Sequence, residues 1–215
     1  MSLLSSPTPT TQAEDVYQDL KTRLMIGAFH PGQKLSIRKL SEAMGAGQAS
    51  VREALKRLAS ERVLHSLAKR SYVVPSLDRH RAAGLFELRA LLECEAGALS
   101  AGRFPVRTLE ALNAAIARME RALTERHHDR YMIANHRFHF LIYNRCGNPD
   151  MIAMIEQLWM QTGPSLRQGL DTAAPDSSWS DLHHALVPAL AARNADAVRS
   201  HLREDVRWNW EDSVG

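Results

Sequence analysis

Apolar residues recur at intervals of three and four along most of the chain, which is the pattern of helices with one buried face. Between Ser36 and Leu58, two short stretches of this kind flank Gly45-Ala46-Gly47. Glycine tolerates the positive φ that an abrupt change of helix direction often demands. This segment therefore predicts two short helices joined by a tight turn.

The second of these helices is expected to have a buried back and a polar front. Its apolar residues between Val51 and Leu58 fall on one side, whereas Gln48, Arg52 and Lys56 follow one another at intervals of four on the other side. Arginine reads guanine edges, glutamine reads adenine edges and lysine holds phosphate, so this front suits a DNA major groove. The periodicity alone fits a helical hairpin with a solvated charged face equally well.

The flanking segments favour the DNA-binding interpretation. A helix is predicted over residues 13–26, and two short β-prone runs, 62–65 and 71–74, flank Lys69 and Arg70. Three helices followed by a basic two-stranded ribbon make a winged helix-turn-helix, whose ribbon tip can reach the DNA backbone or minor groove. Residues 1–75 hold 11 Lys+Arg and 6 Asp+Glu, whereas the remainder holds 16 and 18. The charge balance thus indicates that the N-terminal part meets a polyanion.

Four segments of this region, IGAFHPGQKL, LSEAMG, VREALKRL and KRSYVV, resemble the DNA-binding domain of the GntR family of bacterial transcription regulators. The sequence departs from the usual family pattern at Gln48, where arginine is common, and at Gly47, which lacks an N-capping hydroxyl. Arg62 and Ser71 stand where glycines are common. The resemblance and the helix pattern together give the expected DNA-binding residues as Arg38, Gln48, Ser50, Arg52, Lys56, Lys69 and Arg70.

From Leu77 onward the pattern is helical almost throughout, with helices predicted near 77–101, 106–126, 128–145, 149–169, 179–193 and 194–212. The segments LFELRALLECEAGALSA, NHRFHFLIYNRCGNPDM and HHALVPALAARNADAVRSHL resemble the FCD-type effector domain of one GntR branch. The expected fold is mainly α, with an N-terminal winged helix-turn-helix followed by an all-α antiparallel helical bundle. The expected domains are a disordered tail (1–12), the DNA-binding domain (13–75) and a bundle for effector binding and dimerisation (76–215).

The resemblance also implies a polar site inside the bundle. Many FCD domains hold a divalent metal through an aspartate and a histidine one turn apart and two later histidines. By position these ligands become Asn135, His139, His183 and Asp205. Two imidazoles with one neutral and one charged oxygen can bind zinc or a similar divalent ion, although asparagine is a weaker donor than aspartate. A polar effector pocket without metal, or histidines that only hydrogen-bond their neighbours, are the alternatives.

The expected effector-binding residues are Arg89, Asn135, His139 and His183. Arg89 matches a recurrent family arginine, and inside the bundle it needs a carboxylate partner, either Glu93 or an acid ligand. The neighbouring His136 is expected at the surface. The stripe formed by Leu85, Leu88, Leu92 and Ala96 suits the core and a dimer contact equally well.

The composition narrows the cellular setting. Cys94 and Cys146 form neither a disulfide framework nor a zinc-finger spacing, and the N-terminal residues lack a signal-peptide pattern. No apolar run approaches 18 residues, so a soluble, cytoplasmic protein without membrane contact is expected.

The sequence thus predicts a homodimeric transcription regulator, in the usual family role a repressor. It would bind a double-stranded DNA operator and respond to a small effector, which is expected to be a carboxylic acid. One alternative is a metal-dependent enzyme built on His139, His183 and Asp205, although no hydrolase motif accompanies these residues. The other is a helical oligomerisation protein whose DNA-binding half has decayed.

Overall fold

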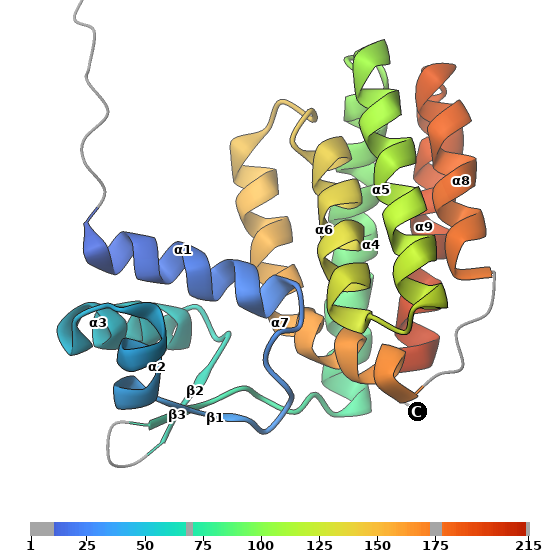
Figure 1. The fold of residues 1–215 in the computed structure, drawn as a ribbon. Coiled ribbons are helices and arrows are strands. Elements are labelled where there is room, and N and C mark those ends of the chain that lie inside the picture. The colour runs from blue at the N-terminus through green and yellow to red at the C-terminus, as the bar shows by residue number, and fades with distance from the viewer. Residues whose placement is uncertain (1–10, 68–70, 173–177, 214–215) are drawn as a thin grey trace, which may run out of the picture.

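The computed structural model describes residues 11–67, 71–172 and 178–213. Figure 1 shows a small N-terminal unit that lies against the side of a bundle of long helices. The mainly helical fold with a helix-turn-helix at the N-terminus is as predicted. The elements of the N-terminal unit are α1 (Gln12–Met25), β1 (Lys34–Ser36), α2 (Ile37–Met44), α3 (Gln48–Ser60), β2 (His65–Leu67) and β3 (Ser71–Val73).

The wing differs from the prediction in two respects. The sheet has three antiparallel strands in the order β1-β3-β2, with both Lys34 and His65 paired to Val73. The predicted two-stranded ribbon is present as β2 and β3, but β1 adds a third strand that was not predicted, because its three residues are too few to show an alternating pattern. The first run also begins at His65 rather than Arg62, since Arg62 has a φ of 61° that a strand cannot adopt.

The N-terminal core lies between α1 and α3. Leu20 and Leu24 of α1 and the apolar face of α3 around Leu55 are almost completely buried, which explains the spacing seen in the sequence. At the edge of this core the Arg57 guanidinium lies 3.6 Å from the centroid of the Tyr17 ring, and the Tyr17 hydroxyl donates to Glu61. These contacts fix the recognition helix α3 against α1.

The remaining helices form the bundle. The prediction placed six helices here, and their ends differ from the observed ones by at most three residues. Helix α4 packs along α9, and α5 packs along α6. Within the described ranges, no helix is both long and apolar enough to cross a lipid bilayer. The bundle helices are α4 (Arg79–Ala101), α5 (Val106–Thr124), α6 (His128–Tyr143), α7 (Pro149–Thr172), α8 (Ser178–Ala191) and α9 (Ala195–Ser213).

The two units meet where α1 crosses α7 (Figure 1). Lys21 of α1 forms an ion pair with Glu156 of α7, and both side chains are largely buried. About two turns further along α7, Gly163 lies against the backbone of α1. A Cβ atom on Gly163 would lie 2.3 Å from the carbonyl oxygen of Leu24 and 2.7 Å from that of Met25. The contact is therefore made by backbone on backbone, and it leaves no room for a side chain.

We expect Gly163→Ala to lower the free energy of unfolding by about 1–3 kcal/mol, because the neighbouring carbonyls cannot move without shifting α1. Gly84→Ala is the matched control. Gly84 also lies inside a helix, but a Cβ there meets nothing within 4 Å. The control should raise stability by about 0.5–1 kcal/mol through helix propensity. Urea unfolding measures both changes, and effects of the same sign and size would contradict the proposed packing at Gly163.

Candidate DNA-binding surface and effector site

The outward face of α3 carries the side chains predicted to contact DNA. Gln48, Arg52 and Lys56 are exposed, and Val51, Ala54, Leu55 and Leu58 occupy the buried face. Arg38, on α2, is also exposed and forms an (i, i+4) ion pair with Glu42 at 3.0 Å. An exposed pair of this kind contributes little stability, so a phosphate can replace the Glu42 carboxylate at small cost. Lys69 and Arg70 lie outside the described residues.

The start of α3 is held by a residue that the sequence assigned to the tail. The Gly47 N-cap has no side-chain acceptor of its own. Instead, the Gln12 Oε1 atom of α1 accepts a hydrogen bond from the Gly47 N–H at 3.0 Å and another from the Ser50 hydroxyl at 2.9 Å. Helix α1 thus begins at Gln12, one residue earlier than predicted, and its first side chain fixes the first turn of the recognition helix.

A second cluster of polar side chains lies inside the bundle, where three helices bring four residues together. Asn135 and His139 come from α6, His183 from α8 and Asp205 from α9, and each is at most 5% exposed. The His183 Nε2 atom lies 3.1 Å from Asn135 Oδ1 and 3.3 Å from His139 Nε2. The Asp205 carboxylate lies 3.5 Å from His139 Nε2 and 3.6 Å from His183 Nε2. All four residues that the resemblance suggested are thus adjacent.

The hydrogen bonds behind His139 fix which of its nitrogens carries the proton. The Tyr143 hydroxyl lies 2.6 Å from Glu93 Oε2 and 3.0 Å from His139 Nδ1. A carboxylate only accepts, so Tyr143 donates its single proton to Glu93 and accepts from the Nδ1–H of His139. Burial holds the pKa of His139 well below its ordinary value, so the ring is neutral. Its Nε2 lone pair therefore faces His183 and Asp205.

Glu93 is also the partner of Arg89. The Arg89 Nε atom donates to Glu93 Oε1 at 2.6 Å, Nη2 donates to Oε2 at 3.3 Å, and Nη1 donates to the Thr162 hydroxyl at 3.3 Å. Both charged side chains are at most 1% exposed. Of the two carboxylate partners considered for Arg89, the structure shows Glu93.

The side chains of Trp159 and His136 pack against each other beside this cluster. The Trp159 ring lies against His139 and covers the Arg89 guanidinium, with 4.6 Å from Cζ to the ring centroid. His136 stacks on Phe140 rather than lying at the surface as expected, because its side of α6 faces α7. Burial lowers the pKa of His136 to about 4. The Trp159 Nε1 and His136 Nε2 atoms are buried without a hydrogen-bond partner.

Sequence reasoning missed Tyr143, Gln12 and Trp159 as parts of these sites. Tyr143 follows His139 by four residues, and Glu93 follows Arg89 by four, so the helical spacing already placed each pair on one face. No local pattern signals the role of Gln12, because its partners lie 35 and 38 residues away.

Comparison with known proteins agrees with this architecture. Residues 84–207 match the FCD domain model, and residues 12–74 match the model for bacterial regulatory proteins of the gntR family. The chain belongs to the gntR family and carries an FCD domain. It is 30% identical over 196 residues to the HTH-type transcriptional regulator McbR of Escherichia coli K12, covering 90% of this chain and 89% of McbR.

Two further comparisons support the same assignment. The solved structure of E. coli McbR/YncC superposes with a TM-score of 0.88 at 29% identity, covering 94% of this chain and 96% of that one. The HTH-type transcriptional repressor GlaR of E. coli K12 is 25% identical over 211 residues, covering 90% of this chain and 93% of GlaR. This gntR-family chain is therefore a DNA-binding transcription regulator and not an enzyme, which sets aside the alternative of a metal-dependent enzyme.

Proposed function

We propose that this regulator acts as a homodimer whose operator affinity changes when a small carboxylic acid binds in the bundle. The observation that carries this proposal is the position of α7 between the two sites. Trp159 and Thr162 of α7 contact the buried polar cluster, while Glu156 and Gly163 contact α1. A ligand that displaces α7 will also displace α1 and the recognition helix that packs on it. Regulation then requires the ligand to bind the two arrangements with unequal affinity.

A divalent metal ion such as zinc is part of the proposed effector site. The donor atoms of His139, His183 and Asp205 lie within 4.8 Å of one another, with the Asn135 amide oxygen beside them. The Tyr143 hydrogen bond leaves the Nε2 lone pair of His139 free toward this point, and two imidazoles with oxygen donors suit zinc. Such an ion would supply a Lewis acid that holds an anionic ligand in the core of the bundle.

Asn135→Asp tests the metal site, because it has opposite effects with and without metal. In metal-free protein a second buried carboxylate beside Asp205 should lower the melting temperature. With Zn²⁺ present the added charge should tighten binding by on the order of tenfold in calorimetric titration. Asn144→Asp, an exposed change at the C-cap of the same helix, is the control and should leave the zinc affinity unchanged. If neither the parent protein nor the Asn135→Asp variant binds zinc, the metal site is wrong and the metal-free polar pocket is the remaining interpretation.

A row of leucines on α4 supports homodimer formation. Leu85, Leu88, Leu92 and Leu99 follow one another at intervals of three, four and seven residues, the spacing of a coiled-coil seam, along one side of α4. Leu88 is 50% exposed and the adjacent Leu91 is 60% exposed. A two-fold axis beside α4 would bury this face against its copy and place two recognition helices for a palindromic operator.

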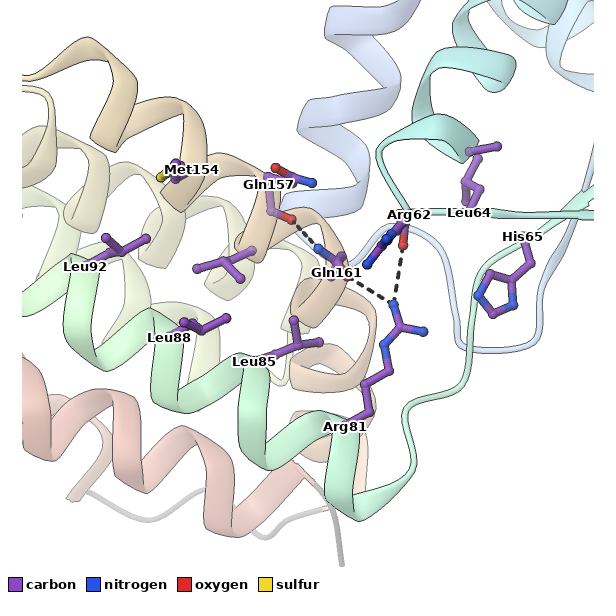
Figure 2. A pocket seen from close by; sticks show the side chains of 12 residues that line it. Arg62, Leu64, His65, Arg81, Leu85, Leu88, Leu92, Met154, Gln157 and Gln161 are labelled. Atoms are coloured by element: carbon purple, nitrogen blue, oxygen red, sulfur yellow. Dashed lines mark hydrogen bonds between the residues drawn. The ribbon is translucent and has the colours of Figure 1, made fainter.

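Figure 2 shows the part of this face nearest the N-terminal unit, a groove of about 580 Å³. The leucines of α4 form one wall, and Met154 of α7, which is 58% exposed, lies opposite. At the other end the Arg81 side chain donates to the Gln161 side chain and to the Arg62 carbonyl oxygen. Because the groove joins both units, a partner copy seated there would also respond to their relative position.

Leu88→Glu should convert the dimer to monomer at micromolar concentration, because each interface would bury two unpaired carboxylates. Ile133→Glu is the matched control, since Ile133 is 52% exposed but lies on α6. Light scattering coupled to size exclusion gives the masses directly. A Leu88→Glu protein that stays dimeric, or an Ile133→Glu protein that dissociates, would place the interface elsewhere.

Arg52→Ala should weaken specific operator binding by about 1–3 kcal/mol, because Arg52 lies exposed at the centre of the recognition face. Arg118→Ala, an exposed arginine change on α5, should leave affinity unchanged. Parent-protein affinity should also fall steeply with salt concentration. Fluorescence anisotropy with an operator fragment measures both effects, and a flat salt dependence would support the decayed DNA-binding half instead.

A further inference from the structure

The buried charges of the described residues all lie in one cluster. Arg89, Glu93 and Asp205 are the Arg, Lys, Asp and Glu side chains buried in the described part of the chain. Tyr143 connects them, because its hydroxyl contacts both Glu93 and His139, and His139 contacts Asp205. The cluster therefore has one positive and two negative groups when Asp205 is ionised.

We propose that Glu93 limits the effector to compounds with a single carboxylate, an inference that rests on the carboxylate-binding function proposed above. Glu93 occupies the position on Arg89 that the second acid group of a dicarboxylate would take. The internal carboxylate thus sets the charge of the ligand.

The hydrogen bonds of Arg89 explain this restriction. Its Nε and Nη2 atoms point to Glu93, and Nη1 points to the Thr162 hydroxyl. A second ligand carboxylate has to displace Glu93, which then remains buried at 0% exposure, bonded to the Tyr143 hydroxyl but without its cation. Leaving one carboxylate of this cluster unpaired is costly, because the interior cannot solvate it.

The charge balance leads to the same class of ligand. The Arg89–Glu93 pair is neutral, so a divalent ion held with Asp205 leaves one positive charge in the core. One carboxylate balances that charge, whereas a dicarboxylate leaves an excess negative charge in a low-dielectric site. The Trp159 indole N–H, buried without an acceptor beside Arg89, offers a neutral donor for a further ligand oxygen.

Matched acids test the proposal with the full-length, zinc-loaded protein. Butyrate is compared with succinate, and propionate with malonate, by calorimetric titration and thermal shift. We expect each monocarboxylate to raise the melting temperature and to bind at least about tenfold more tightly than the dicarboxylate of equal length. Equal or tighter binding of the dicarboxylates would overturn the role of Glu93. Absence of binding by all four acids would instead overturn the proposed carboxylate effector, and this inference with it.

Glu93→Gln then tests the residue itself. The variant removes the charge that competes for the Arg89 donors. The affinity for succinate and malonate should therefore rise at least about tenfold relative to the affinity for butyrate and propionate. Glu95→Gln is the matched control on the same helix, since Glu95 is half exposed and pairs with Arg199. An unchanged ratio in a folded Glu93→Gln protein would contradict the proposal. If that variant does not fold, the comparison of acids on the parent protein still decides.

Discussion

The buried ion pair between Arg89 and Glu93 is the interaction on which the interior of the bundle depends. Neither charge tolerates burial alone, because an unpaired ion in the interior costs several kcal/mol. The Glu93 Oε2 atom, which accepts the longer of the two bonds from Arg89, also accepts from the Tyr143 hydroxyl. That hydrogen bond fixes the proton of Tyr143, which in turn fixes the proton of His139. The ligand atoms of the candidate metal site are thus oriented by a pair of charges that lies beside it.

Helix α7 connects this buried cluster to the N-terminal unit. One side of the helix holds Trp159 and Thr162 against the ion pair, and another holds Gly163 against the backbone of α1. A contact between side chains can adjust by changing rotamers, whereas a contact between two backbones has no rotamers to change and transmits strain directly. The absence of a side chain at Gly163 therefore makes α1 follow α7. Because α1 also holds α3 through the packing around Leu20 and through Gln12, the recognition helix follows as well.

Much of this fold could be predicted from periodicity, because the helices are long and each hides one face. The candidate functional sites were harder to predict from the sequence. The four-residue spacing places Asn135 beside His139, but nothing local indicates that α8 and α9 bring His183 and Asp205 to the same point. That information came from the resemblance to FCD domains. Periodicity also misassigned His136, since a polar residue next to a predicted ligand looks exposed until the position of α7 is known.

Helix α4 shows a further limit of sequence patterns. Its buried face carries Arg89 and Glu93 among apolar residues, whereas Leu88, Leu91 and Leu99 are exposed, so polarity does not follow exposure along this helix. A pattern that assumes one apolar face cannot tell which side of such a helix meets the core. This arrangement is stable only if the buried charges pair within the chain and the exposed leucines are buried against another molecule. The first condition is met by the Arg89–Glu93 pair, and the second is the physical argument for a partner copy on α4.

The recognition helix provides a corresponding argument about DNA binding. The replacement of a capping hydroxyl by Gly47 suggested that this half of the chain had lost its function. However, the side-chain Oε1 atom of Gln12 accepts from the Gly47 N–H and the Ser50 hydroxyl, so the first turn of α3 is held from outside the helix. Glycine at an N-cap costs only a few tenths of a kcal/mol compared with a hydroxyl residue. A recognition helix that no longer bound DNA would not need such a compensating contact. The departures at Gly47 and Gln48 are therefore better explained by a different operator sequence than by loss of DNA binding.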